Sequence, residues 1–340
     1  MGVDISDLLT RHQTTLKEQK GIRVSIDAFN IMYQFLSSIR QPDGTPLTDT
    51  QGRVTSHLSG VFYRTISLID AGIRPVYVFD GKPSSLKNRT LEARRLVKEK
   101  NKIELEVARE AGDEERIRSL SSRINYLSRD MVKEAMELLD YMGIPYVVAP
   151  SEGEAQASVM CKNGLVDGVV SQDYDCILFG ARRVFRNFTM FGRRKVPGRN
   201  IYLNINPEYI DLEENLNLLG INRDRLIEIG IMVGTDFNRG IQRVGARTAM
   251  KLIKKHGNIG NVLASRNIEI ENLDEVIELF RNPPYTAEFS TDLKKPDTEK
   301  IIDFLCNRHD FSPNRVEPYV QTLNLSARKN SQKNLDSFFQ

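Results

Sequence analysis

Seven carboxylates occupy five places along this 340-residue chain, and each place follows an apolar run. The seven are Asp27, Asp80, Glu152, Glu154, Asp173, Asp175 and Asp236. The preceding runs are strand-like or buried in character and cover residues 22–26, 75–79, 145–149, 168–170 and 229–233. Strands that alternate with helices form a largely parallel sheet, and their carboxyl ends lie along one edge. The acids are therefore predicted to meet.

A cluster of seven carboxylates must be neutralised by cations or partly protonated, because like charges repel. Oxygen ligands suit Mg²⁺ or Mn²⁺ rather than zinc, and the chain has only four His and three Cys. A cluster of this size indicates two ions roughly 4 Å apart, as in phosphodiester hydrolysis. The alternative is that each acid caps a helix or lies on the surface. The close pairs Glu152/Glu154 and Asp173/Asp175 favour a metal site.

The charges outside this cluster are predominantly basic. The chain has 48 Lys and Arg against 45 Asp and Glu; without the seven clustered acids, 48 basic residues face 38 acidic ones, a balance of +10. A basic body around an acidic centre suits a polyanionic partner. An ordinary solvated charged surface remains the alternative.

Composition excludes several other classes of protein. Three scattered cysteines are too few for a disulfide framework, which indicates a reducing compartment. No stretch resembles a signal peptide or a membrane span, so we expect a soluble, intracellular protein with no membrane partner. The first six residues fit an N-myristoylation pattern, but no basic cluster accompanies them and we reject lipidation.

Apolar residues at helical spacing predict crossover helices at 28–39 and 55–71, with a turn at 41–46 between them. A further helix at 131–142 leads to the strand before Glu152, and the sheet is expected to be complete by about residue 180. These elements predict an α/β fold with a mostly parallel, twisted central sheet flanked by helices.

Residues 82–130 are charge-dense and break near residue 112, which predicts two protruding helices. Between Lys82 and Lys102 there are eight basic and two acidic residues, and Lys87 and Arg94 fall on one helical face. A solvated face is the alternative. Contact with phosphate is favoured because the segment directly follows Asp80.

Two further segments have the composition of nucleic-acid contacts. Residues 182–199 carry seven basic residues and no acid, interleaved with Phe185, Phe188 and Phe191, and Gly192 suits a hairpin turn. This predicts a DNA-facing ribbon, although edge strands also carry Lys and Arg to prevent aggregation. The hairpin at residues 240–246 precedes a basic helix, an arrangement that can bind phosphate through backbone amides. An ordinary corner between helices remains possible there.

The C-terminal part is expected to be helical over 290–323, followed by a disordered linker at 326–333. Leu335, Phe338 and Phe339 then cluster on one side of a helical turn with no local core beneath them. We expect this tail to dock on a partner. Folding back onto the chain's own body is the alternative.

Five segments together resemble the flap endonuclease family of structure-specific 5′ nucleases, and the similarity runs over nearly the whole chain. They are Val24-Ser25-Ile26-Asp27-Ala28, Val76-Tyr77-Val78-Phe79-Asp80-Gly81-Lys82-Pro83, Ala149-Pro150-Ser151-Glu152-Gly153-Glu154-Ala155-Gln156-Ala157, Ser171-Gln172-Asp173-Tyr174-Asp175 and Gly234-Thr235-Asp236-Phe237. The resemblance implies a PIN-like 5′ nuclease fold with a helical arch and a helix-hairpin-helix. It also implies two Mg²⁺ ions held by the seven carboxylates, with Mn²⁺ able to substitute.

The resemblance further implies that Lys87 and Arg94 act in catalysis at the scissile phosphate, that Gly2 lies near the active site and that Tyr33 stacks on a base. The other DNA-binding residues that it implies are Arg40, Gly234, Asp236, Arg243, Gly245, Arg247 and Lys251. The tail is similar to a sliding-clamp-binding box, which consists of Gln332, Leu335, Phe338 and Phe339. The expected partners are branched DNA with a 5′ flap and the clamp, through residues 332–339.

Three regions are expected: a nuclease core at 1–215 with an arch at about 82–130, a helical DNA-binding region at 216–325 with the helix-hairpin-helix at about 235–256, and a flexible tail at 326–340. The chain departs from the family pattern at Arg243, where the family usually has Gly. It also lacks a long basic extension, which favours an archaeal-type enzyme, a monomer in the cytoplasm or nucleoid. A processive 5′ exonuclease, a bubble-cutting repair nuclease and a non-catalytic junction-binding clamp adaptor are the rival interpretations.

Overall fold

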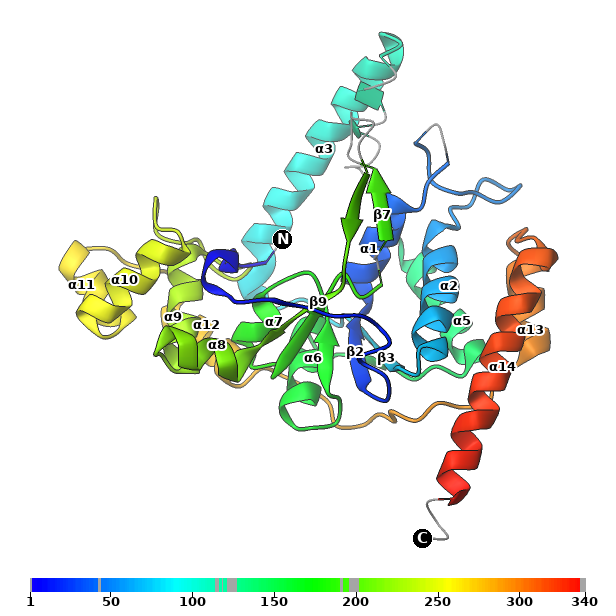
Figure 1. The fold of residues 1–340 in the computed structure, drawn as a ribbon. Helices are drawn as coiled ribbons and strands as arrows, with labels where there is room; N and C mark the ends of the chain where they lie inside the picture. The colour runs from blue at the N-terminus through cyan, green and yellow to red at the C-terminus, as the bar shows by residue number, and fades with distance from the viewer. Residues whose placement is uncertain are drawn as a thin grey trace.

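A computed structural model describes residues 2–41, 44–113, 116–117, 119–120, 127–189, 192–195 and 202–336. A seven-stranded sheet lies at its centre with helices packed on both faces (Figure 1). The strands are β1 (His12–Gln13), β2 (Arg23–Asp27), β3 (Arg74–Phe79), β4 (Tyr146–Val148), β5 (Gly168–Val170), β6 (Arg183–Arg186) and β9 (Glu208–Asp211). Their order across the sheet is β1-β9-β6-β5-β2-β3-β4.

The five strands from β6 to β4 are parallel, whereas β9 is antiparallel to both β6 and β1. The predicted α/β class and the mostly parallel sheet are therefore confirmed. The expectation that the sheet ends by about residue 180 is wrong, because β6 and β9 follow that point and β1 comes from the N-terminus. A strand of two residues such as β1 carries too short an alternation to be recognised in a sequence.

The helices lie between the strands and on the C-terminal side of the chain. They are α1 (Ala28–Ser38), α2 (Ser56–Asp70), α3 (Asn88–Glu110), α5 (Arg129–Met142), α6 (Gly153–Lys162), α7 (Asp175–Leu178), α8 (Leu212–Leu219), α9 (Arg223–Val233), α10 (Ala246–His256), α11 (Ile259–Arg266), α12 (Leu273–Arg281), α13 (Thr298–Ile302) and α14 (Pro313–Asp336). Short 3₁₀ turns at Ser6–Leu8 and Ser85–Lys87 and a π turn at Asp303–Asn307 complete the described elements. Within the described ranges, no helix is long and apolar enough to cross a membrane.

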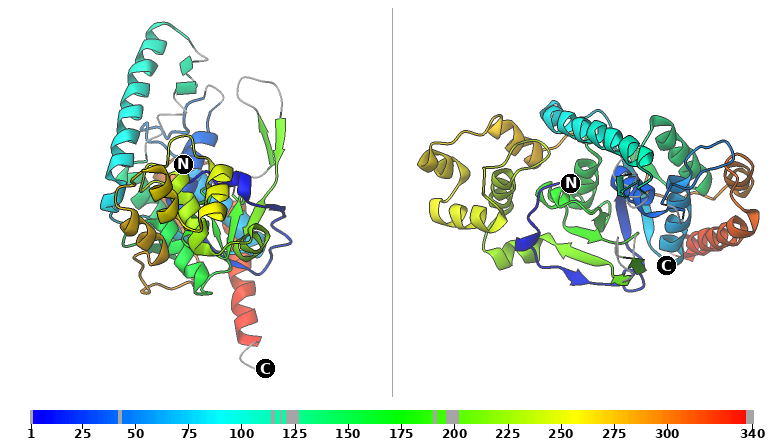
Figure 2. Two further views of the ribbon diagram at one scale, coloured as in Figure 1. Left: turned by 90° about the vertical axis from the view of Figure 1, so that its left-hand side faces the viewer. Right: turned by 90° about the horizontal axis from the view of Figure 1, so that it is seen from above.

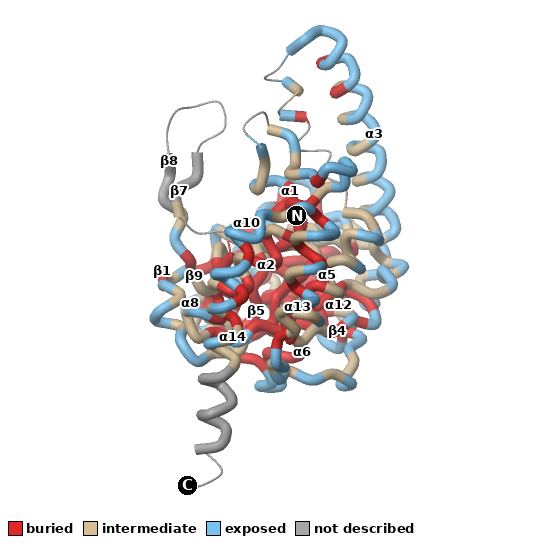
Figure 3. The backbone as a smooth tube through the Cα atoms, turned by 90° about the vertical axis from the view of Figure 1, so that its right-hand side faces the viewer, coloured by how far each residue is buried: buried red, intermediate tan, exposed pale blue. Residues whose placement is uncertain are grey.

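Alternation along each strand separates the apolar side chains into two cores, one on each face of the sheet. In β3, Val76 and Val78 belong to the core that also includes side chains of α6, α9 and α10, while Tyr77 and Phe79 belong to the core that includes side chains of α1, α2 and α5. Because successive side chains of a strand point to opposite faces, a strand buried on both faces reads as a continuous apolar run. Figure 3 shows this buried layer in red beneath an exposed upper part of the molecule.

Two structures rise above the strand ends. Helix α3 projects away from the body on one side, and a ribbon formed by β7 (Gly192–Lys195) and β8 (Tyr202–Ile205) rises on the other side, apart from α3 (Figures 1 and 2). The first predicted arch helix is therefore present. Of the second, the structure describes only residues 116–117 and 119–120, where Leu120 packs against Leu105 and Ala108 of α3.

The predicted basic ribbon at 182–199 is displaced along the chain. Its first part is strand β6 of the central sheet, and Phe185 and Phe188 are fully buried rather than facing DNA. Gly192 begins β7 instead of forming a turn. Aromatic residues between arginines are compatible with either a sheet strand or a surface ribbon, and the sequence pattern alone does not separate the two. Phe191 lies outside the described residues.

The C-terminal expectations also need correction. Residues 290–297 have no regular secondary structure and lead into α13. Helix α14 continues to Asp336, so the stretch at 326–333 that was expected to be a linker has helical backbone. Helix formation propagates more easily than it nucleates, and the first half of α14 is held by buried Val316, Val320 and Leu323.

Helices α1 and α2 approach each other closely at Gly60. A Cβ atom built on Gly60 would lie only 2.1 Å from the Phe35 ring. We expect Gly60→Ala to lower the free energy of unfolding by about 1–3 kcal/mol through overpacking, although Ala is the better helix former.

Chemical denaturation measures this change. The matched control is Gly260→Ala in α11, where the added Cβ meets nothing closer than 3.4 Å and propensity should make the change neutral or stabilising. Equal stability of the two variants would contradict the close packing of α1 on α2.

Candidate active site

The ends of the parallel strands open into a cavity of about 1900 Å³ at the base of α3. Six of the seven predicted acids line it, and they are Asp27, Asp80, Glu152, Glu154, Asp173 and Asp236. The seventh, Asp175, is 2% exposed and lies beneath, at the start of α7. The prediction that these distant acids converge is therefore confirmed by their positions.

Local structure explains how most of the acids reach this edge. Asp27 ends β2, Asp80 follows β3, and Glu152 and Glu154 stand at the start of α6. Asp236 differs, because the apolar run before it is helix α9 rather than a strand. A fully buried helix has the same continuous apolar sequence as a buried strand, so that distinction was not available from the pattern.

Hydrogen bonds from the surrounding chain hold several of these carboxylates. Asp27 accepts from the amide of Asn30 at 3.0 Å and so caps α1 while facing the cavity. Asp80 accepts from the amide of Gly153 at 2.7 Å, and Glu154 accepts from the hydroxyl of Ser171 at 3.2 Å. Capping and membership of the acidic cluster are thus compatible roles for the same side chain.

The N-terminal residues Gly2 and Val3 bind two of the acids through their backbone amides. The amide of Gly2 donates to Asp173 Oδ1 at 3.3 Å, and the amide of Val3 donates to Asp175 Oδ1 at 2.7 Å. A Cβ atom on Gly2 would lie 2.8 Å from Asp175 Oδ2, so only glycine fits without movement. The expectation that Gly2 lies near the acids is confirmed in its geometry.

Crowding and burial disfavour ionisation of the deepest acids. Burial, followed by the charge of Asp80, raises the pKa of Asp27 to about 8. Burial likewise raises the pKa of Asp175 to about 7 and that of Asp80 to about 6, with Asp236 and Glu152 respectively adding repulsion. Burial and then Asp173 and Asp27 raise the pKa of Glu154 well above its usual range. Burial and the neighbouring acids therefore oppose full ionisation of this cluster unless positive charge is brought close to it.

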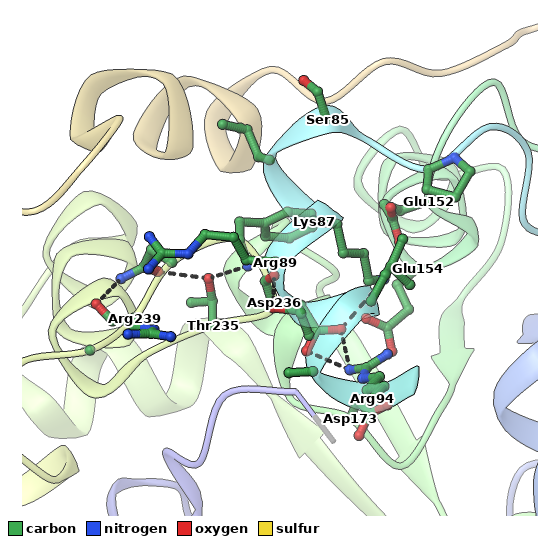
Figure 4. A pocket seen from close by; sticks show the side chains of 18 of the residues that line it. Ser85, Lys87, Arg89, Arg94, Glu152, Glu154, Asp173, Thr235, Asp236 and Arg239 are labelled. Atoms are coloured by element: carbon green, nitrogen blue, oxygen red, sulfur yellow. Dashed lines mark hydrogen bonds and ion pairs between the residues drawn. The ribbon is translucent and has the colours of Figure 1, made fainter. Parts of the chain in front are cut away.

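Two basic side chains supply part of that charge from the base of α3. Lys87 forms an ion pair with Glu152 and lies 3.4 Å from Asp236 Oδ2. Arg94 donates from one nitrogen to both oxygens of Asp236 at 2.6 Å, and Figure 4 shows its guanidinium pointing at that carboxylate. Burial lowers the pKa of Lys87, but Glu152 and Asp236 raise it by more, so the ammonium stays charged.

The donor set fits hard divalent cations, since every candidate ligand is a carboxylate and burial and neighbouring acids raise the pKa values of several of them. Among the described residues, no three His, Cys, Asp or Glu side chains are already arranged around one ion position. Lys87 and Arg94 occupy Glu152 and Asp236 in this arrangement. A cation that binds Glu152 and Asp236 would compete with these two side chains.

The other predicted DNA-binding residues lie in two groups. Tyr33 is 44% exposed and lines the cavity, while Arg40 donates to the carbonyls of Ser37 and Gly44 nearby. Gly234 lies at the C-terminal end of α9 with φ 108°, and Gly245 is the N-cap of α10.

Helix α10 carries Arg247 and exposed Lys251, and Arg247 pairs with Asp7 at 3.3 Å. Arg243 has φ 63°, a left-handed conformation that favours glycine. Glycine would adopt this conformation without the strain that Arg243 bears. Of the predicted clamp box, Phe338 and Phe339 lie outside the described residues, and the side chains of Gln332 and Leu335 are not described.

Sequence reasoning missed two contributors to the site. Asn30 hydrogen-bonds to both Asp27 and Asp173, and its place three residues after Asp27 in a helix start was the available signal. Arg186 on β6 stacks over the ring of Tyr174 at 4.4 Å and so braces the residue between Asp173 and Asp175. No local sequence pattern marks a contact between separate strands and loops.

Comparisons with known proteins agree with this geometry. The family descriptions "XPG N-terminal domain" and "XPG I-region" match residues 1–101 and 143–236. The chain is 55% identical to flap endonuclease 1 of Picrophilus torridus and 48% identical to that of Methanosarcina acetivorans, over 100% of each pair. This chain belongs to the flap endonuclease family. It is accordingly a nuclease.

Solved structures of the family share its architecture. The flap endonuclease-1 of Methanococcus jannaschii matches with a TM-score of 0.78 and 43% identity, covering 96% of this chain and 100% of that one. The catalytic core of Rad2 in complex with a DNA substrate matches with a TM-score of 0.72 and 25% identity, covering 95% of this chain and 100% of that one. The overall fold is therefore shared with both solved structures.

The raised pKa values make the cation-free enzyme sensitive to pH. A carboxyl whose folded-state pKa exceeds its unfolded value of about 4 stabilises the fold at low pH, and this contribution is lost as pH rises through the folded-state pKa. For Asp27 and Asp175, whose pKa values are raised to about 8 and about 7, we expect the melting temperature in chelator to fall between about pH 5 and about pH 8.

Added Mg²⁺ should restore the melting temperature at the upper end of this window. Thermal melts with chelator and with Mg²⁺ measure the effect, and the double variant Asp27→Asn with Asp175→Asn is the control that should flatten the slope. A melting temperature in chelator that rises steadily from about pH 5 to about pH 8 would show that the acids are not crowded as described.

Proposed function

We propose that this enzyme binds branched DNA and hydrolyses one phosphodiester near the junction of a 5′ flap, with a 5′ exonuclease activity at the same site. One observation carries the proposal: six carboxylates from separate elements line a single cavity, and the base of α3 places two cationic side chains at its rim. The family relatives named flap endonuclease 1 support the substrate. Replication and repair, where Okazaki fragments mature, are the corresponding processes.

The seven carboxylates would hold two Mg²⁺ ions, for which Mn²⁺ could substitute. When bound, these ions supply Lewis acidity and lower the pKa of the attacking water. The protein's own part is to gather the ligands: β2, β3, α6 and the loop after β5 each deliver acids to one edge of the sheet. Because folding already holds these ligands in place, the entropy cost of bringing them together is not part of the reaction barrier.

Lys87 and Arg94 would act on the scissile phosphate. Both cations now pair with Glu152 and Asp236, which are proposed ligands. Once metal charge neutralises those acids, the ammonium and the guanidinium would be free to bind the phosphate and to stabilise the negative charge that develops in the transition state. The same side chains therefore serve as counter-ions before substrate arrives and as phosphate ligands afterwards.

Duplex and single-stranded DNA would contact different parts of the molecule. Tyr33 at the cavity rim would stack on a base, with Gly2 and Arg40 nearby. The hairpin at Gly245 would direct the start of α10 toward phosphate oxygens, with Arg247 and Lys251 adding charge. Such contacts carry no base information, so substrate shape selects the cut site. We propose that the protein works as a monomer on DNA.

The proposed activity is tested with end-labelled 5′-flap, 3′-flap and linear duplex DNA, in Mg²⁺ and in chelator. We expect cleavage of the 5′ flap near its junction in Mg²⁺, weaker 5′ exonuclease products from duplex, and nothing in chelator. Preferential degradation of linear duplex would favour a processive exonuclease instead. Absence of cleavage in both Mg²⁺ and Mn²⁺ would leave only a junction-binding adaptor.

Asp173→Ala should abolish cleavage, by a factor of about 10³ or more, because a metal ligand at the reacting centre is lost. DNA binding should be unchanged or tighter, since one negative charge near the phosphate is removed. Single-turnover cleavage and electrophoretic mobility shifts measure the two effects. Cutting by the variant at the wild-type rate would refute the assignment of Asp173.

We also propose that residues 332–339 bind the sliding clamp through Gln332, Leu335, Phe338 and Phe339. Removing residues 332–340 should leave cleavage of free flap DNA unchanged while abolishing stimulation by the clamp. Cleavage rates with and without the clamp measure the stimulation. The matched variant is the full-length chain with Leu335 and Phe338 replaced by alanine, which should lose the stimulation without loss of chain length. Equal stimulation of the truncated enzyme would contradict the role of the tail.

A further inference from the structure

We propose that Asn30 is a positioning residue that fixes the carboxylates of Asp27 and Asp173 relative to each other for cation binding and catalysis. This inference rests on the proposed function of the acidic cavity. Asn30 stands in the first turn of α1, is half-buried, and lines the cavity.

Asn30 connects two acids that come from different strands. Its backbone amide donates to Asp27 Oδ1 at 3.0 Å, and its side-chain Nδ2 donates to Asp173 Oδ2 at 2.9 Å. Asp27 ends β2, whereas Asp173 follows β5, and these strands are neighbours in the sheet. One residue thus sets the separation of two acids that are 146 positions apart in the sequence.

The orientation of the Asn30 amide is itself determined by its neighbours. Its Oδ1 accepts from Gln34 Nε2 at 2.6 Å and from the backbone amide of Gln172 at 3.3 Å. Reversing the amide would place an oxygen against the Asp173 carboxylate and an NH₂ group against two donors. Nδ2 is therefore held toward Asp173, and Gln172 ties the loop before this acid to α1 as well.

Asp173 is held at both oxygens. Oδ1 accepts from the amide of Gly2 at 3.3 Å, while Oδ2 accepts from Asn30. Donors on both oxygens define the plane of the carboxylate. Residues that hydrogen-bond to a metal ligand fix the orientation of that ligand and strongly affect metal affinity.

A neutral amide suits this task better than a cation or another acid. Lys87 and Arg94 neutralise the carboxylates that they contact, Glu152 and Asp236. Asn30 orients Asp173 without cancelling its charge, so the negative charge remains available. Asn is also a weak helix former, so its presence in α1 is not explained by helix propensity.

The test compares Asn30→Leu, which is similar in size but has no donor, with Asn30→Asp, which places a second acid against Asp173. Asn217→Leu on the exposed face of α8 is the matched control for the chemical change. Each protein is measured by Mn²⁺ calorimetry without DNA, by cleavage of 5′-flap DNA over a range of Mg²⁺ concentrations, and by thermal melting in chelator.

We expect Asn30→Leu to weaken Mn²⁺ binding and to lower kcat about 10- to 100-fold, as for other supporting partners of metal ligands. KM for DNA should change less than about threefold, because Asn30 contributes no charge to phosphate binding. The Mg²⁺ midpoint, which is the Mg²⁺ concentration that gives half-maximal cleavage, should shift further in Asn30→Asp than in Asn30→Leu. Asn217→Leu should match the wild type in Mn²⁺ affinity, kcat and this midpoint. If Asn30→Leu fails to fold in chelator, Asn30→Ala, which also has no side-chain donor, replaces it with the same criteria.

The inference would be overturned if a folded Asn30→Leu variant had an Mn²⁺ affinity and a kcat within about twofold of those of Asn217→Leu. Loss of a supporting partner of a metal ligand changes metal affinity or activity by much more than that. A loss of kcat with unchanged Mn²⁺ affinity and an unchanged Mg²⁺ midpoint would overturn it too. The proposed function fails separately, when the wild type does not cut flap DNA; Mn²⁺ calorimetry then still decides whether Asn30 positions the acids.

Discussion

The burial of several carboxylates close together, which opposes their ionisation first through desolvation and then through mutual repulsion, is the constraint around which this molecule is organised. A carboxyl such as Asp27, whose pKa rises from 3.8 to about 8, opposes its own ionisation by several kcal/mol, an amount on the order of a domain's whole stability. The chain tolerates this because the acids stand on strand ends that are fixed by two apolar cores. The sheet therefore stabilises an arrangement of charges that would otherwise separate.

The same repulsion explains the contacts of Lys87 and Arg94. Without metal ions, the strongest available neutralisation comes from cations on the chain, and the base of α3 carries several. The contacts hold the first turns of α3 against the rim, and Thr90 adds a hydrogen bond to the Asp236 carbonyl at 2.7 Å. Charge in the cavity and the position of the arch base are thereby coupled, because whatever neutralises the acids also weakens the attachment of α3.

The sequence predicts the overall fold better than it predicts the type and position of individual elements. The strands before Asp27 and Asp80 were predictable because a strand buried on both faces leaves a continuous apolar run. The run before Asp236 has the same composition but is helix α9, and Phe185 belongs to a sheet strand instead of a surface ribbon. In both cases tertiary burial, rather than local periodicity, decides the structure, and burial is not visible in a short segment.

In the site, the acidic residues could be predicted from the sequence, whereas most of the contacts that support them could not. Acids are recognisable because seven carboxylates in close pairs are costly without a purpose, whereas Asn30 and Arg186 act through contacts with residues far away in the chain. The spacing of Asn30 from Asp27 marks only its local contact, whereas its hydrogen bond to Asp173 and the contact of Arg186 with Tyr174 depend on where the fold places those residues. A metal site built from strand ends therefore has ligands that sequence can propose and supporting partners that only the folded chain identifies.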